Sequence, residues 1–504
     1  MKIFIAQILI LLCFFYARSQ DINGIVLSDT GSVTVVKVWG THQERAYAHG
    51  YLLGNGIKAI YDGYFAPLIG SNMDAYKTII EEGTSIKIDP VFHSEAQAMI
   101  QGMADAGVDT TGTDYLELLV ANSFLDLMAL PGKSSEKKTT NGCSSLMSWG
   151  EATAGTDLDG ASVISRHVDW YPAPALTENQ VIIIHIPSEA DEQPWLLIGF
   201  AGQISVLSGI SSSGLSAFQH MMSDFSGSSA LNMAFEPVWF TLRRSLEKTD
   251  INDDGYTNIN DIKYALAENT NGYADGYLIS ALAPSTAGHD SLIAMVAEVA
   301  PETPLQVYRG NEYNDSIPSD NLYTANAQIK RNDMHNYCDR YLAVINAIGN
   351  GLYISSEKNL SIMKDHSNGQ THNVQFMQHI PEQNILKLAV YYNSIPAYQN
   401  IMVSYDLTDL FAPVTEMQNS PPGGQNINVF PNPFDSSTVF HLPEKQNSVY
   451  DLRIMDIKGK TLLEENNITG KTYKLNRKHL KPGVYIYKFT DNKNNTYQGK
   501  IVIL

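Results

Sequence analysis

Cysteine is scarce in this sequence, with three residues in a chain of 504. Cys13 falls within an apolar stretch at the N-terminus, which leaves Cys143 and Cys338 in the rest of the chain. Two cysteines exclude a disulfide-rich scaffold, because such folds depend on several bridges. A single bridge between Cys143 and Cys338 remains an alternative, and it would prevent Cys143 from acting as a nucleophile.

Positively charged residues are also few. The chain has 34 Lys and Arg residues against 53 Asp and Glu residues, which gives a formal net charge of -19. This balance argues against a nucleic-acid partner, since phosphate backbones attract basic surfaces. It fits an exported protein with acidic clusters that hold cations.

Long apolar runs are absent beyond the N-terminus. Met1 and Lys2 precede the apolar stretch 3–16, which is too short to cross a bilayer comfortably. Ala17 and Ser19 supply the small residues that signal peptidases require before a cut near position 20. Residues 1–19 are therefore predicted to be a signal peptide, and no stable membrane span is expected in the rest of the chain.

The remaining chain divides by composition into four parts. Residues 20–142 are predicted to be mostly helical after a short strand, whereas 143–411 alternate short apolar strands with helices. A linker rich in Pro and Gly over 412–426 precedes a small β domain over 427–504. The pattern of 143–411 predicts an α+β fold in which stacked sheets are covered by helices.

Several helices can be placed from apolar spacing and capping residues. One is predicted over 42–64, and two others are predicted to begin at the N-caps Ser94 and Thr113. Two further helices are predicted, over 230–247 and over 334–348.

Residues 250–261 have the spacing of a twelve-residue calcium loop. Gly255 stands at the sixth position, where a sharp turn lets six to eight oxygen atoms converge on one ion. The loop is similar to the dockerin type, with 259–267 as the helix that follows, although a dockerin needs two such loops. A solvated turn is the alternative to a structural Ca²⁺. The predicted ligands are Asp250, Asn252, Asp254, Tyr256, Asn258 and Asp261.

The segment around Cys143 carries the strongest signal for chemistry. Gly142 precedes the cysteine, a strand-like run follows it, and Arg166 and Asp169 come on the next predicted strand. This layout suits a cysteine that becomes a new N-terminus by self-cleavage. Its α-amine, with an ordinary pKa of about 7.7–8, could then act as the base for its own thiol. Arg166 is expected to lower the thiol pKa, and Asp169 to orient the amine.

The reaction also needs a donor for the oxyanion. Asn326, at the end of the predicted strand Leu-Tyr-Thr-Ala-Asn, is the best-placed asparagine side chain for this role. No organic cofactor is expected, since the cysteine and its amine supply the chemistry.

The motifs resemble the N-terminal-nucleophile hydrolases of the choloylglycine hydrolase type, above all the autoproteolytic acyltransferases and amidases of the peptidase C45 family. The run from Cys143 to Thr153 is similar to the family's Cys-Thr-Ser-Phe-x-x-Trp-Gly-x-Ala-Thr. Ser165 to Trp170 is similar to Gly-Arg-Asn-x-Asp-Trp. The resemblance covers about residues 38–412, and it implies an αββα sandwich.

Further along the chain, the resemblance assigns two more residues. Tyr323–Asn326 is similar to the family's Thr-Asn-His-Phe, which implies that Asn326 is the oxyanion asparagine. Asp339–Tyr341 is similar to the family's Asp-Arg-Tyr, which implies that Arg340 is a second active-site arginine. Gln219 and His220 stand where relatives often carry another active-site asparagine, and either is a candidate for the second oxyanion donor.

The last part of the chain resembles the C-terminal sorting domain of the type IX secretion system. The motifs are Asn428–Phe434, Val449–Lys460, Leu480–Tyr485 and the final Lys500–Leu504. The strands and Gly turns predict a small β-sandwich, and the resemblance implies export through the periplasm to the cell surface or the medium, with the secretion machinery as a partner. A carbohydrate-binding or adhesion module is the alternative.

Together these features predict a secreted, self-cleaving cysteine hydrolase that acts on the amide bond of a small N-acyl substrate, as an amidase or an acyltransferase. Two alternatives remain open. One is an ester hydrolase similar to phospholipase B, and the other is a surface binding protein without catalysis that Ca²⁺ stabilises.

Overall fold

In the computed structural model the chain forms two compact units, Ile22–Pro413 and a smaller unit that contains Val414–Leu504. The predicted signal peptide, Cys338 and nearly all of the predicted linker lie outside the described residues. The described residues are 22–29, 32–131, 142–222, 228–230, 232–286, 292–313, 316–331, 339–366, 371–413, 427–430, 432, 434–442, 449–455, 460–477, 480–481, 483–492 and 496–503.

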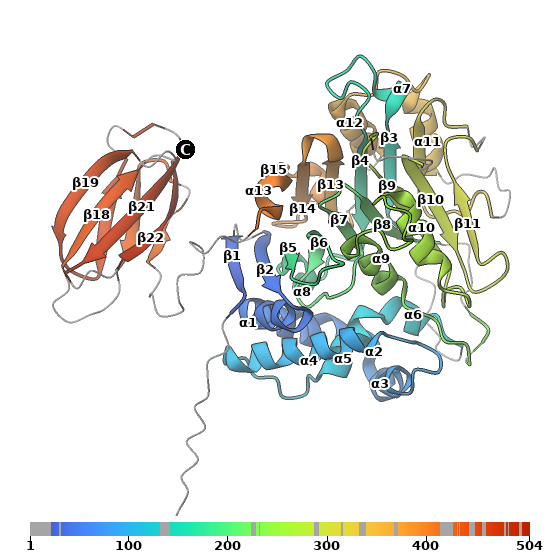
Figure 1. The fold of residues 1–504 in the computed structure, drawn as a ribbon, viewed down its shortest axis with the longest axis horizontal. Helices are drawn as coiled ribbons and strands as arrows, with labels where there is room; N and C mark the ends of the chain where they lie inside the picture. The colour runs from blue at the N-terminus through green and yellow to red at the C-terminus, as the bar shows by residue number, and fades with distance from the viewer. Residues whose placement is uncertain are drawn as a thin grey trace, which may run out of the picture. The chain divides into compact units, whose positions relative to one another are not determined.

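The larger unit starts with two strands and continues as a series of helices (Figure 1). Helix α1 (His42–Ile60) begins at Thr41, which forms a capping box with Glu44 and so satisfies amides of the first turn. It passes into a π-helix, η1 (Tyr61–Phe65), a rare element that is frequent at functional sites. The other elements here are β1 (Gly24–Asp29), β2 (Thr34–Gly40), α2 (Ala66–Ile69), η2 (Gly70–Asn72), α3 (Met73–Glu82), α4 (Pro90–Asp105), α5 (Tyr115–Asn122) and α6 (Phe124–Met128).

The two predicted caps in this region are wrong. Helix α4 is capped by Asp89, because Pro90 fits the first helical position, and the Ser94 hydroxyl donates to the Pro90 carbonyl inside the helix. Helix α5 is capped by Asp114 rather than Thr113, through a capping box with Glu117.

Two sheets form the rest of the larger unit. Nine strands are ordered β1-β2-β5-β6-β7-β8-β9-β10-β11, and six are ordered β12-β3-β4-β13-β14-β15. The described pairs run antiparallel, except that β2 runs parallel to β5 and so joins the N-terminal strands to the sheet. The strands are β3 (Ser144–Ser148), β4 (Val163–Asp169), β5 (Gln180–Pro187), β6 (Trp195–Phe200), β7 (Ser208–Ser211), β8 (Ser216–Met221), β9 (Tyr277–Leu282), β10 (Ala294–Val299), β11 (Gln306–Arg309), β12 (Asn321–Thr324), β13 (Asn373–Ile380), β14 (Ile385–Val390) and β15 (Val403–Asp406).

Both sheets contribute to one apolar core. Met147 and Met377 from the six-stranded sheet belong to the same buried cluster as Ile183 and Ala217 from the nine-stranded sheet. Strand β5 is an almost continuous apolar run because both of its faces are covered. The sheets are therefore stacked against each other, as the alternation of strands and helices predicts.

Helices contact both sheets. Helices α1, α9 and α10 contact the nine-stranded sheet, and α11 and α12 contact the six-stranded sheet. Helix α10 occupies the predicted 259–267, but α9 begins only at Val238, because Pro237 disfavours helix in the residue before it. The helices of this part are α7 (Gly150–Thr153), α8 (Pro174–Thr177), α9 (Val238–Glu247), α10 (Ile259–Ala267), α11 (Asp339–Ile348), α12 (Ser356–His366), η3 (Pro381–Gln383), η4 (Ala397–Gln399) and α13 (Leu407–Phe411).

The smaller unit is built from strands, as predicted. Phe440 and Leu452 come from different sheets but share one buried core, and β18 alternates buried and exposed residues. The three-stranded sheet comprises β16 (Asn428–Phe430), β17 (Ser437–His441) and β20 (Thr472–Asn476). The four-stranded sheet comprises β19 (Thr461–Ile468), β18 (Tyr450–Met455), β21 (Gly483–Asp491) and β22 (Thr496–Ile503). Within the described residues of the chain, no helix has the length and apolar character that crossing a bilayer requires.

Candidate active site

Cys143 lies immediately before β3 in the six-stranded sheet. Its thiol is free and buried, with 7% of the residue exposed. On either side of β3, Ser145 pairs with Arg166 on β4 and with Thr324 on β12. This register brings the start of β3 close to Asp169 at the end of β4 and to the residues that follow β12.

Arg340, in the first turn of α11, holds the peptide group that precedes Cys143. Its Nη1 donates to the Gly142 carbonyl oxygen at 2.5 Å and lies 3.3 Å from Oδ2 of Asp169. Its Nη2 donates to Oδ1 of Asn326. The guanidinium therefore connects the predicted cleavage site with two of the predicted catalytic residues.

Asn326 packs directly against Gly142. A Cβ at position 142 would overlap the Asn326 amide, so any larger residue would force that side chain to move. The Nδ2 of Asn326 donates to the Met221 carbonyl at 2.7 Å, while its Oδ1 accepts from Arg340. Both ends of the amide are thus engaged, which fixes its orientation beside the Gly142–Cys143 bond.

Asp169 is a buried carboxylate with a partner on the neighbouring strand. Asn373, its register partner on β13, donates from Nδ2 to Oδ1 at 2.8 Å. Burial raises the pKa of Asp169 to about 6, against the opposing effects of Arg340, Asn373 and Arg166. The group is therefore charged at neutral pH.

Burial opposes the effect of Arg166 on the thiol. Its Nη2 donates to the Gln219 carbonyl at 2.7 Å, so the side chain connects β4 with β8 of the other sheet. Burial raises the pKa of Cys143 despite the attraction of Arg166. Arg166 does lower the thiol pKa, as expected, but in the uncut chain desolvation outweighs the nearby charge and the net shift is upward.

Gln219 and His220 occupy different surroundings, as neighbours on a strand do. The Nε2 of His220 lies 3.0 Å from the Ser280 hydroxyl and 3.2 Å from the Ser145 hydroxyl, between the sheets. Burial, with Arg166 nearby, holds its pKa well below the usual value, so the ring is neutral. Gln219 instead lines a pocket: its Oε1 accepts from Nε1 of Trp239 at 2.9 Å, and its Nε2 has no hydrogen-bond partner among the described residues.

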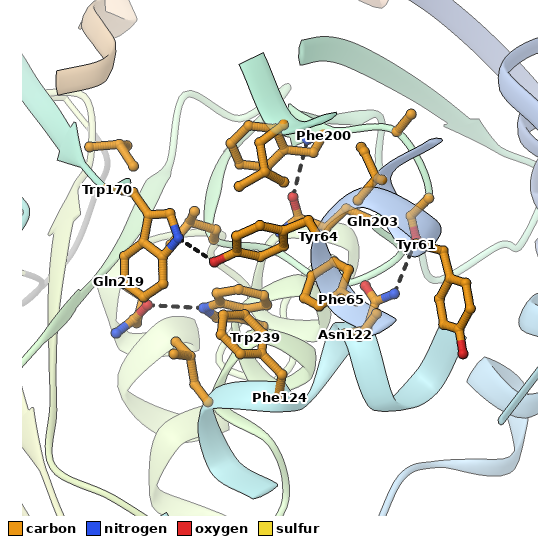
Figure 2. Close-up of a pocket in the computed structure, with 18 of the residues that line it drawn as sticks. Tyr61, Tyr64, Phe65, Asn122, Phe124, Trp170, Phe200, Gln203, Gln219 and Trp239 are labelled. Atoms are coloured by element: carbon orange, nitrogen blue, oxygen red, sulfur yellow. Dashed lines mark hydrogen bonds between the residues drawn. The ribbon is translucent and has the colours of Figure 1, made fainter. Parts of the chain in front are cut away.

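The pocket beside Cys143 is large and apolar. It contains about 910 Å³ of empty space, counted to its open mouth, and Gly142, Cys143, Asp169 and Gln219 form part of its lining. None of the described residues that line it is Lys, Arg or His. Its aromatic lining residues are Tyr61, Tyr64, Phe65, Phe124, Trp170, Phe200 and Trp239 (Figure 2).

Much of the pocket wall comes from the N-terminal part of the chain. The π-helix supplies Tyr61, Tyr64 and Phe65, and α6 supplies Phe124. Nε1 of Trp170, next to Asp169, donates to the Tyr64 hydroxyl at 2.6 Å (Figure 2). The hydrogen bond joins the pocket wall to the strand that carries Asp169.

The predicted calcium loop is closed by its own carboxylates. Asp250 accepts from the amides of Asp254 and Gly255, each at 2.8 Å. Asp261 accepts from Ile251 and Asn258, each at 2.7 Å, and its capping box with Asn258 starts α10. Asp250 and Asp261 thus accept hydrogen bonds from backbone amides of the loop itself. Asn252 donates to Asp254 at 2.9 Å, and Tyr256 is 46% exposed.

Sequence reasoning missed several residues of this region. Asn373, Tyr64 and Trp239 lie far from Cys143 in the sequence, and each contacts a residue of the site or lines its pocket. Asn373 follows a polar stretch and starts a strand that the apolar pattern did not predict. The one signal in the sequence for this part of the site was Trp170, which is adjacent to Asp169 and donates a hydrogen bond to the Tyr64 hydroxyl.

Comparison with known proteins identifies the C-terminal unit. Residues 428–504 match the family model described as a secretion system C-terminal sorting domain. The match confirms the predicted sorting domain, and it indicates secretion to the cell surface or the outside. No curated protein matches the chain at a significant level.

Two solved structures are weakly similar to about half of the chain. The first is the N-acylethanolamine-hydrolyzing acid amidase ortholog of Caenorhabditis elegans, with 14% identity, a TM-score of 0.33, and coverage of 47% of this chain and 93% of that one. The second is a mutant of conjugated bile acid hydrolase from Clostridium perfringens, with 14% identity, a TM-score of 0.34, and coverage of 53% and 94%.

Proposed function

We propose that the larger unit is a self-cleaving cysteine hydrolase of the N-terminal-nucleophile class, which cuts the amide bond of an N-acyl substrate. The observation that carries this proposal is the Gly142 carbonyl, held 2.5 Å from Nη1 of Arg340 directly before the free thiol of Cys143. A guanidinium on a carbonyl oxygen stabilises the negative charge that forms there on nucleophilic attack. The αββα layering expected for the class is supported by the shared core of the sheets and the helices that contact each of them.

The first reaction frees the amine of Cys143. Its sulfur attacks the Gly142 carbonyl carbon, the bond to the Cys143 nitrogen breaks, and the thiol proton passes to that nitrogen. Gly142 is then held on sulfur as a thioester, which water hydrolyses to a carboxylic acid and the restored thiol. Arg340 stabilises the oxyanion in both steps, because its Nη1 already contacts that oxygen.

The second reaction uses the new N-terminus on a substrate. The α-amine takes the thiol proton, and the charged Asp169 orients the resulting ammonium, as the third member of a triad does. Sulfur attacks the substrate carbonyl, the ammonium gives its proton to the leaving amine, and a thioester forms. Water resolves the thioester with the α-amine as base, while Asn326 donates to the oxyanion.

The apolar pocket favours a substrate with an uncharged, bulky acyl group. Its walls are aromatic and aliphatic, and its described lining offers no cation to an anionic acyl group. The amide nitrogen and its substituent would then face the mouth of the pocket. The alternative, an ester hydrolase similar to phospholipase B, requires the same nucleophile but a different leaving group.

A substrate panel separates these two reactions. Matched amides and esters of aromatic and aliphatic acids would be assayed with the exported protein, with Cys143→Ala as the blank. Faster turnover of the amides with apolar acyl groups than of short or anionic ones supports the proposal. Turnover of phospholipid esters alone would overturn the amidase assignment, and no turnover above the blank would overturn the proposed activity.

Gln219 is the second oxyanion donor in this proposal. Trp239 fixes the Oε1 end of the amide, and the buried Nε2 end, which has no hydrogen-bond partner among the described residues, is the donor that the proposal assigns to the oxyanion. Replacing Gln219 with Leu should lower kcat by roughly 10²-fold, the usual effect of losing one such donor, without preventing self-cleavage.

Gln203→Leu is the comparison variant for this prediction: Gln203 lines the same pocket, its Oε1 accepts from the Phe200 amide at 3.3 Å, and its Nε2, like that of Gln219, has no hydrogen-bond partner among the described residues. It should change KM more than kcat. Steady-state kinetics of the two variants measure the difference, and an unchanged kcat in Gln219→Leu would exclude the role.

Calcium binding to the loop 250–261 also belongs to the proposal. The oxygen-rich turn suits a hard cation, and burial raises the pKa of Asp261, a cost that a bound cation would offset. The ligands would be those predicted from the sequence, with a stabilising role. At 100-fold excess over its Kd, Ca²⁺ should stabilise the protein by about 2.7 kcal/mol.

Thermal unfolding with Ca²⁺ or a chelator measures this effect. Asp250→Asn should remove most of the Ca²⁺-dependent rise in Tm. Asp253→Asn, in the same loop at a position that is not a predicted ligand, should retain it, and both residues have positive φ angles that Asn tolerates. Equal Tm values with and without Ca²⁺ would contradict the prediction.

A further inference from the structure

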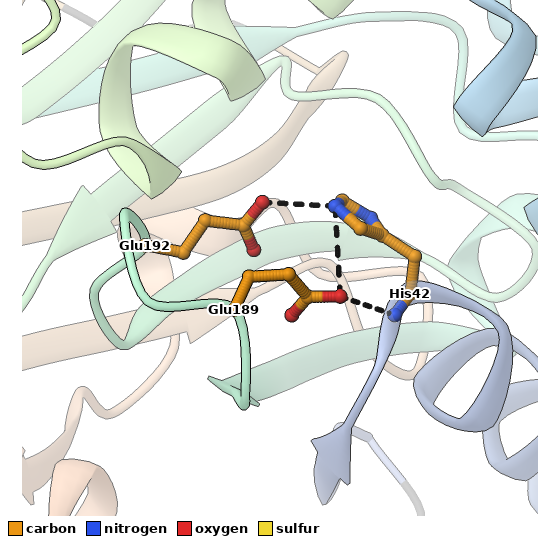
Figure 3. A group of neighbouring side chains, drawn as sticks. All are labelled: His42, Glu189 and Glu192. Atoms are coloured by element: carbon orange, nitrogen blue, oxygen red, sulfur yellow. Dashed lines mark hydrogen bonds and ion pairs between the residues drawn. The ribbon is translucent and has the colours of Figure 1, made fainter.

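A buried group of charged side chains lies at the start of α1, away from the Cys143 pocket. The backbone amide of His42 donates to Oε1 of Glu189 at 2.9 Å, and the ring Nε2 of His42 lies 2.8 Å from Oε1 of Glu192 (Figure 3). The other ring nitrogen, Nδ1, contacts Oε1 of Glu95 on α4. The imidazole is therefore placed between two carboxylates.

Two arginines complete the group, which we call the His42 cluster: His42, Arg45, Glu95, Glu189, Glu192 and Arg243. Arg45 donates to Glu189 at 2.7 Å and to Glu192 at 3.1 Å. Arg243 on α9 donates to both oxygens of Glu95, each at 2.5 Å. His42, Arg45, Glu95 and Arg243 are all buried, so the pairs are shielded from solvent and salt.

The cluster crosses the boundary that self-cleavage would create. His42, Arg45 and Glu95 precede the Gly142–Cys143 bond in the sequence, whereas Glu189, Glu192 and Arg243 follow it. After the cut, the ion pairs of His42 and Arg45 with Glu189 and Glu192, and that of Arg243 with Glu95, would join two separate chains. Separating the chains would break all of these ion pairs together, and a charged group that stayed buried in its own chain would lose its partners, which is strongly unfavourable.

We propose that the His42 cluster is an electrostatic latch that keeps the N-terminal chain on the catalytic chain after cleavage, with protonated His42 at its centre. The latch has this role in the mature protein only if the proposed self-cleavage takes place. It also matters for catalysis, because Tyr61, Tyr64 and Phe124 of the N-terminal chain form walls of the pocket. Loss of that chain would open the pocket to water.

A metal site is the competing explanation of the same residues. Ligand atoms of His42, Glu189 and Glu192 all lie within 4.8 Å of one another, close enough to bind one ion. However, Arg45 already donates to both glutamates, and Lys248 donates to Glu192 at 3.0 Å. A divalent ion would have to displace these cations or lie beside them, so ion pairing is favoured.

The latch should weaken in alkaline solution. Burial alone would lower the pKa of His42, but Glu192 and Glu95 outweigh it and raise the pKa to about 9. The stabilisation is then complete below the ordinary pKa of about 6.5 and is lost as pH rises through about 9. The further charged or titratable groups around the cluster are His49 on α1, His185 on β5, Asp191 before β6, and Glu247 and Lys248 at the end of α9.

The test cuts the chain without relying on self-cleavage. A protease site is inserted between residues 132 and 141 of the full-length Cys143→Ala variant, and the cut protein is analysed by size-exclusion chromatography and native mass spectrometry at pH 6 and pH 9.5. The two pieces should stay together at pH 6 and bind at least about tenfold more weakly at pH 9.5. His42→Gln should weaken binding at pH 6 and remove most of the pH dependence, whereas His93→Gln, on α4 outside the cluster, should behave as the parent.

Each possible result either supports or overturns the proposed latch. Separation of the pieces at pH 6, or the same pH dependence in His42→Gln and the parent, would overturn the latch. Separation by EDTA at pH 6 would identify a metal site instead. If His42→Gln fails to fold, the pH dependence of the cut parent still decides. Failure of the proposed self-cleavage is detected separately, because the wild-type protein would then run as one uncut chain on a denaturing gel.

Discussion

Cys143→Ala should remain a single chain and should have no measurable amidase activity. The variant lacks the sulfur that attacks the Gly142 carbonyl, so the α-amine at position 143 is never released. Loss of a catalytic nucleophile lowers kcat by roughly 10⁶-fold in a well-studied serine enzyme, and a similar loss is expected here. A denaturing gel and an amide hydrolysis assay measure the two effects.

Two controls make this result specific. Cys143→Ser keeps an attacking oxygen, so it should cleave slowly rather than not at all. Circular dichroism should show the same fold for all three proteins, because one small side chain in the buried lining changes. A Cys143→Ala protein that still separates into two pieces at this bond would show that another protease makes the cut.

Arg340→Ala should slow self-cleavage by roughly 10²–10³-fold, the range measured when an oxyanion donor is removed. The guanidinium contacts the Gly142 carbonyl, Asp169 and Asn326, so its loss removes the charge that polarises the scissile bond and releases both neighbours. The rate is measured as the disappearance of the uncut chain on a gel, in protein purified under conditions that hold the precursor.

Arg340→Lys should be intermediate, because an ammonium keeps the charge but cannot contact three groups in the same geometry. Arg244→Ala is the matched control: this arginine on α9 pairs with Glu236, which precedes α9, and with Glu268, which directly follows α10, and its loss should leave the cleavage rate unchanged. Cleavage of Arg340→Ala at the parent rate would remove Arg340 from the mechanism.

Local parts of the site could be predicted from the sequence. Cys143 directly precedes β3, and Arg166 and Asp169 lie on β4, the next strand in the chain, so their proximity follows from a simple antiparallel pair. Asn326 could be named only as the asparagine at the end of a predicted strand, and Arg340 only through a family resemblance, because β12 pairs with β3 across a long stretch of sequence. Their contacts with Gly142 are a result of tertiary packing.

Other features depend on packing that no local pattern encodes. The raised pKa of the Cys143 thiol comes from burial, and burial depends on how two sheets and several helices close over the strand. The same holds for the pocket wall, which the π-helix Tyr61–Phe65 brings from the N-terminal part. The caps Asp89 and Asp114 were missed for a local reason, since other polar residues, Ser94 and Thr113, offered alternative starts for the two helices.

The N-terminal sequence of the mature, active protein tests the central claim most directly. Edman degradation or mass spectrometry of the two separated pieces should find one that begins Cys-Ser-Ser-Leu, with Cys143 as its first residue. Active protein in which every molecule still carries an intact bond between Gly142 and Cys143 would contradict the mechanism.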